Sequence, residues 1–76
     1  MQKTMSREKM IKIYEEKIKL IFGNTIEYNT DHAKAIAEVK TWLNLEWICG
    51  DIEDMYLYGD LLDRVDPIAN RIIQNL

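Results

Sequence analysis

The chain is poor in cysteine, proline and glycine, with one, one and three of them among 76 residues. A single cysteine, Cys49, cannot form an internal disulfide, whereas small secreted domains usually depend on several. Apolar runs are also short, as at 20–22, and a bilayer span needs about 20 apolar residues. The first residues carry no apolar core of a secretory signal. We therefore expect a cytoplasmic protein without a membrane segment.

The sequence lacks the common catalytic motifs. It contains no GxxxxGK[ST], GxGxxG, HExxH or GxSxG pattern and no EF-hand loop. Its one histidine, His32, follows Asp31 at the predicted start of a helix, where an exposed or capping role is favoured over catalysis. Cys49 follows Trp47 and Ile48, which indicates a buried, inert thiol. We predict no enzymatic activity, no catalytic residue, no cofactor and no metal site.

What the chain does have is a composition typical of a folded domain. Apolar residues make up 47% and charged residues 30%, so intrinsic disorder is excluded. The length allows one small core. We predict a single helical-bundle domain spanning residues 1–76.

Apolar periodicity predicts two helices in the first fifty residues. The first begins with Ser6 as N-cap and ends at Gly23, followed by a loop over 25–30. Its apolar positions recur at three- and four-residue steps: Met10, Tyr14, Ile18 and Ile21, with Ile11 and Phe22 beside them. The second runs from Asp31 to Cys49 and ends at Gly50. Its stripe consists of Ile36, Val39, Leu43 and Trp47.

Two more helices are predicted after Gly50. Asp51 is the expected cap of the third, whose stripe is Ile52, Met55, Tyr56 and Leu62, widened by Tyr58, Leu61 and Val65. Asp66 before Pro67 is an N-cap followed by proline at the first helical position, which predicts a short C-terminal helix. The fold class is therefore all-α, a compact bundle of three longer helices and one short one.

Charge is divided unevenly along the chain, whose net charge is −3. Residues 1–22 hold six basic and three acidic residues, whereas 46–66 hold seven acidic residues and one arginine. This balance disfavours nucleic acid as a partner, because phosphate contacts need a positive face. It favours either a basic protein partner or pairing between the basic first helix and the acidic segment, within one molecule or between copies.

The acidic segment also carries tyrosines. Tyr56 and Tyr58 lie two apart, so on a helix one faces inward while the other stands out among acids. We predict a partner-binding face made of Glu53, Asp54, Tyr58, Asp60 and Asp63. The expected function is that of a small regulator or inhibitor acting through protein contacts. Its compact, accessory character suits a phage or mobile-element gene.

Two other functions stay open. Two tryptophans, four tyrosines and four methionines exceed the needs of a minimal bundle, so we expect a homo-oligomer. Such an oligomer could bind a small, nucleotide-like ligand between Trp42, Trp47 and arginines, although core packing of both tryptophans is favoured.

The third function comes from a resemblance. Asp51 and Asp54, followed by the aromatic and aliphatic run 55–58, resemble the acidic helix of the MazG-type all-α nucleoside-triphosphate pyrophosphatases. That resemblance implies two carboxylates on one helix face and a magnesium-dependent pyrophosphatase. The family's earlier ExxE helix has no counterpart, because the segments beginning at Glu15 and Glu38 both lack the second acid.

Overall fold

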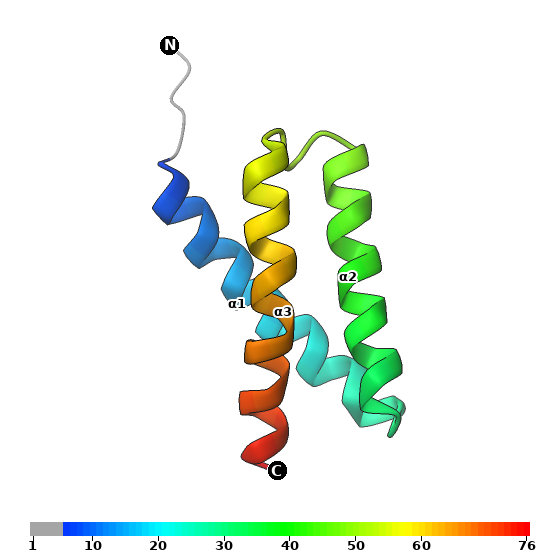
Figure 1. The fold of residues 1–76 in the computed structure, drawn as a ribbon. Coiled ribbons are helices and arrows are strands. Elements are labelled where there is room, and N and C mark those ends of the chain that lie inside the picture. Colours follow the sequence, from blue (N-terminus) through cyan, green and yellow to red (C-terminus); the bar gives the residue numbers. More distant parts are fainter. Residues whose placement is uncertain (1–5) are drawn as a thin grey trace.

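The computed structural model describes residues 6–76 and contains three α-helices packed together. They are α1 (Arg7–Tyr28), α2 (His32–Ile48) and α3 (Met55–Gln74). Helices α2 and α3 run side by side in opposite directions, and α1 crosses both at an angle (Figure 1). No strand occurs in the part of the chain that is described. The prediction of an all-α bundle is confirmed.

Helix α1 begins as predicted and ends later. The Ser6 Oγ caps it by accepting from the Lys9 N–H at 3.2 Å. Gly23 does not end it and does not adopt the left-handed conformation expected of a C-terminal cap. Among the described residues, the only glycine with a positive φ is Gly50. The helix continues to Tyr28, and Ile26 in this extension packs against the core. The predicted loop over 25–30 is therefore wrong for most of its length.

The bounds of α2, His32–Ile48, agree closely with the predicted helix from Asp31 to Cys49. The Asp31 carboxylate accepts from the Lys34 N–H at 3.3 Å, and the chain leaves the helix at Gly50, whose φ of 90° favours glycine. Cys49 is the C-cap and is exposed, so the prediction of a buried thiol is wrong. His32 lies half-buried in the first turn.

Helix α3 starts later than predicted. Its N-cap is Asp54, which accepts from the Tyr56 N–H at 2.9 Å, and not Asp51. Asp51 and Ile52 lie in the preceding turn, where both backbone N–H groups donate to the Glu46 carbonyl at 2.9 and 3.2 Å. The Ile52 side chain is fully buried and fixes this connection to the core.

The predicted fourth helix is not present among the described residues. Helix α3 continues through Gly59 and Pro67 to Gln74. Its buried residues recur every four positions across the proline: Leu57, Leu61, Val65 and Ala69. Burial of this continuous stripe outweighs the local tendency of Pro67 to start a new helix.

The core lies where the three helices meet. Its fully buried larger side chains are Phe22, Ile18, Leu43, Ile52, Leu61, Val39 and Val65. None of the helices within residues 6–76 combines the length and the hydropathy that a bilayer span requires.

Candidate protein-binding surface

The predicted acidic face meets α1 inside the same molecule. The Arg7 guanidinium donates to Asp54 Oδ2 at 3.0 Å and also to Asp60 Oδ2. All three side chains stay about half exposed. The hydrogen bond to Asp60, together with the charges of Asp60 and Asp54, raises the pKa of Arg7 above its ordinary value. The first turn of α1 is thereby held against the start of α3.

Other acids of the face are differently placed. Glu53 and Asp63 are exposed and make no ion pair with any described residue. Pairing between the basic first helix and the acidic segment therefore occurs within one chain at Arg7, as one of the open interpretations predicted. Glu53 and Asp63 take no part in this pairing.

Tyr58 does not stand out from the surface. Its ring stacks on Trp47 with 4.8 Å between centroids and 15° between planes, and its hydroxyl donates to Asn44 Oδ1 at 3.1 Å. It is half-buried between α2 and α3. The outward member of the tyrosine pair is Tyr56, whose side chain is 77% exposed.

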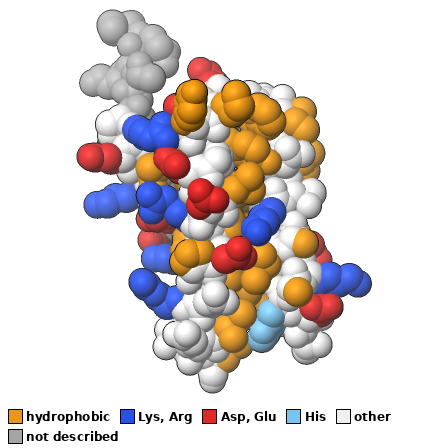
Figure 2. All heavy atoms as spheres, in the orientation of Figure 1, with side chains coloured by type: hydrophobic (Ala, Val, Ile, Leu, Met, Phe, Trp, Pro, Cys, Tyr) orange, Lys and Arg blue, Asp and Glu red, His pale blue; other side chains and the backbone are white. Residues whose placement is uncertain are grey.

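Large apolar side chains are exposed at the end of the bundle where α2 stops and α3 starts. We call Leu45, Ile48, Met55 and Tyr56 the tip patch, since each is exposed and Ile48 and Met55 reach 67% and 62%. Hydrophobic atoms gather along the upper end of the molecule (Figure 2), which is the α2–α3 end in Figure 1. Contiguous exposed apolar patches mark interaction sites, whereas single exposed apolar residues do not.

The tip patch was missed from the sequence, although a signal exists. Leu45 and Ile48 lie three residues apart on α2, outside the buried positions Ala35, Val39 and Leu43. Neither Leu45 nor Ile48 is among the apolar residues that pack against the core. The exposed acids Asp51, Glu53 and Asp54 lie in or beside the connection that joins the two halves of the patch.

Tyr14 connects α1 to α2 below this surface. It is 4% exposed, and its hydroxyl donates to Glu46 Oε1 at 3.0 Å. Its ring lies 5.9 Å from that of Trp42, which packs against the core. Burial, followed by the hydrogen bond to Glu46, raises the pKa of Tyr14 to about 12.

The raised pKa of Tyr14 predicts a loss of stability at high pH. Because the folded-state pKa of about 12 lies above the ordinary value of 10, the phenol's contribution is complete below pH 10 and is lost as the pH rises through 12. At pH 11 the free energy of unfolding should fall by about 1.4 kcal/mol more than in Tyr14→Phe. Urea unfolding of both proteins at pH 8 and pH 11 measures this difference. Parallel losses in the two proteins would contradict it.

The carboxylate pair behind the MazG-type resemblance is arranged differently from what that resemblance implies. Asp51 lies in the turn and Asp54 is the N-cap, so the two are not presented on one helix face. Within residues 6–76, no group of three or more histidine, cysteine, aspartate or glutamate side chains is placed to hold a metal ion.

The tryptophans contribute to packing. Trp42 lies against the core, and Trp47 stacks on Tyr58. No protein-family model, curated protein or solved structure matches the chain.

Proposed function

We propose that this protein is a non-enzymatic regulator or inhibitor that docks a basic protein partner at the α2–α3 end. The observation that carries the proposal is the tip patch, since Ile48, Met55 and Tyr56 expose most of their side chains beside carboxylates. Apolar anchors surrounded by charge are typical of protein interfaces. An exposed tyrosine supplies a large contact area at a small entropic cost.

Charge supports a basic partner in particular. Asp54 and Asp60 already accept hydrogen bonds from the guanidinium of Arg7, so their carboxylates have the acceptor geometry that an arginine requires. Glu53 and Asp63 extend the negative face without an ion pair among the described residues. Negative charge beside an apolar anchor accelerates encounter with a basic partner and disfavours acidic ones.

The test substitutes Tyr56 and compares it with a matched tyrosine. Tagged protein captures its partner from lysate of the source cells, and the affinity of the purified pair is then measured by titration. Tyr56→Ala should weaken the complex at least about tenfold. Tyr28→Ala is the control, because Tyr28 is 88% exposed at the other end of α1 and should leave the affinity unchanged. Circular dichroism should be the same for both variants.

A charge reversal tests the acidic component separately. Glu53→Lys should slow association, and this difference should shrink at high salt because exposed charges are screened. Glu27→Lys, a reversal at an exposed residue of α1, is the control. If both reversals and both tyrosine variants bind alike, the α2–α3 end is not the docking surface.

Self-association through the same patch is the second candidate, favoured by its exposed apolar area. Light scattering at low and high salt measures the solution mass. If the protein forms a dimer that Tyr56→Ala dissociates and Tyr28→Ala does not, the patch joins two copies of this chain. If the protein is a monomer at low and at high salt, the tip patch does not join two copies, and a different protein remains the proposed partner.

A further inference from the structure

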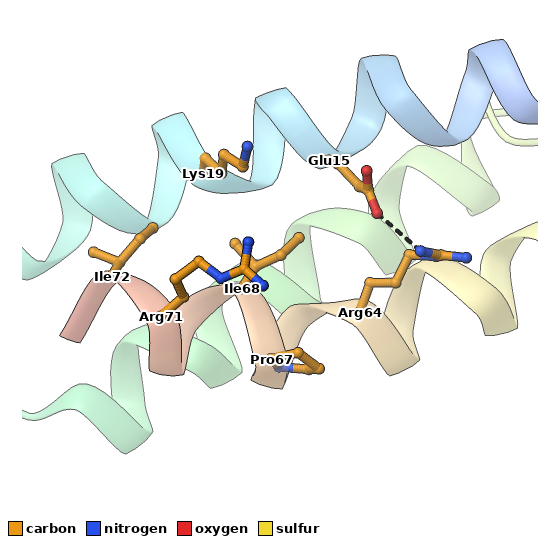
Figure 3. Close-up of a pocket in the computed structure, with 7 residues that line it drawn as sticks. All are labelled: Glu15, Lys19, Arg64, Pro67, Ile68, Arg71 and Ile72. Carbon is orange, nitrogen blue, oxygen red and sulfur yellow. Dashed lines mark hydrogen bonds and ion pairs between the residues drawn. The ribbon is translucent and has the colours of Figure 1, made fainter. Parts of the chain in front are cut away.

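A groove lies between α1 and α3, and none of the predicted acidic-face residues lines it. It has a volume of about 310 Å³. Its lining residues are Glu15, Lys19, Arg64, Pro67, Ile68, Arg71 and Ile72 (Figure 3). The volume is at the lower end of the range of small-molecule sites.

The lining combines positive charge with apolar surface. Lys19, Arg64 and Arg71 outnumber Glu15, so the groove has a net positive charge in a chain whose net charge is −3. Ile68 and Ile72 are only partly buried against the core and present apolar surface to the groove, together with Pro67. A ligand that fits this lining needs a negative head and an apolar body.

The three cations are engaged to different degrees. The Arg64 guanidinium donates to Glu15 Oε2 at 2.9 Å, and the Lys19 ammonium contacts Glu16 at 3.1 Å. Arg71 makes no ion pair with any described residue. Lys19 comes from α1 and Arg71 from α3, so the two cations stand on opposite walls of the groove (Figure 3).

We propose that this groove binds a small phosphate monoester with an apolar body. The lining carries three positive charges and one negative charge, which matches the charge of about −2 that a phosphate monoester has near neutral pH. Lys19 and Arg71 hold the phosphate between them, and an arginine fork suits phosphate oxygens. The body lies on Pro67, Ile68 and Ile72.

Octyl phosphate is the probe, used below the concentration at which it forms micelles. Titration calorimetry should show saturable binding of octyl phosphate. Inorganic phosphate, which lacks the apolar chain, and 1-octanol, which lacks the phosphate, should each bind at least about tenfold more weakly. Equal binding of inorganic phosphate would overturn the assignment of an apolar body. No binding of octyl phosphate would overturn the site.

Three variants locate the binding. Arg71→Ala should weaken octyl phosphate about tenfold through loss of a charge-assisted hydrogen bond. Lys34→Ala, an exposed cation on α2 outside the groove, should leave it unchanged. Glu15→Gln should strengthen binding, because it removes the negative charge from the lining and releases Arg64. A gain in affinity is a result that structural damage does not produce.

Two outcomes would contradict binding of the phosphate monoester in the groove. If Arg71→Ala and Lys34→Ala weaken binding equally, the interaction is a general attraction to surface charge. If phosphatidylglycerol vesicles bind the protein while octyl phosphate does not, the basic surface recognises a membrane and the groove is not the site. Partner capture by the tip patch is independent of both results, since no residue is shared between the two surfaces.

Discussion

Phe22→Ala should reduce the free energy of unfolding by about 3–5 kcal/mol. Phe22 is fully buried on α1 and is the first-ranked by volume of the fully buried side chains. The substitution removes apolar area from the core and leaves a cavity that the neighbouring helices cannot fill completely. A chain of this length has a total stability of only about 4–11 kcal/mol, so a large part of it would be lost.

Urea unfolding followed by circular dichroism measures this loss. Leu20→Ala is the matched control, because Leu20 lies two residues away on the same helix and is 65% exposed. It should change stability by no more than about 0.5 kcal/mol. If the two variants unfold at the same urea concentration, Phe22 does not occupy the core position that the packing assigns to it.

The end of α1 shows where local sequence signals stop being decisive. Gly23 followed by Asn24 is a good helix end by local propensity, which predicts the end of α1 there. In the structure, Ile26 packs against the core and the Thr25 hydroxyl donates to the Ile21 carbonyl at 2.8 Å, so the helix continues. Tertiary burial is not visible in a local pattern, and it outweighs the roughly 1 kcal/mol that glycine costs inside a helix.

The local sequence predicts the caps of α1 and α2 correctly and misplaces the cap of α3. Ser6 and Asp31 each directly precede an apolar repeat, and both are confirmed as caps, although Asn29 and Thr30 are capping residue types as well. After Gly50, Asp51 and Asp54 compete. Ile52 is buried in the turn before α3, so the helix starts after it with Asp54 as the N-cap. This burial is a tertiary contact, which the local sequence does not show.

The start of α3 at Asp54 instead of Asp51 also explains why the tip patch was not predicted. A helix that starts at Asp51 suggests a core stripe containing Met55 and Tyr56, which would leave Tyr58 exposed. The buried stripe of α3 contains Leu57 and Leu61 instead, so Met55 and Tyr56 become surface residues. The uneven charge along the chain left two interpretations open, a basic partner or pairing between the first helix and the acidic segment, and Arg7 makes such a pairing within the chain.

Pro67→Ala should raise the free energy of unfolding by about 2–3 kcal/mol. Pro67 lies inside α3, with a helix of twelve residues before it and seven after it from Met55 to Gln74. A proline there has no N–H to donate to the Asp63 carbonyl, and its ring crowds the preceding turn. Alanine restores the hydrogen bond and removes the crowding, while the greater freedom that it gives the unfolded chain offsets less than about 1 kcal/mol.

Asn70→Ala separates this effect from a general gain in helix propensity. Asn70 is exposed on the same helix, and its replacement should add no more than about 0.7 kcal/mol. The two variants and the parent chain are compared by thermal and urea unfolding. A melting temperature for Pro67→Ala at or below that of the parent would mean that the proline ring contributes packing that α3 depends on. A gain well above that of Asn70→Ala would show that burial of Leu61, Val65 and Ala69 holds α3 together across an unfavourable residue.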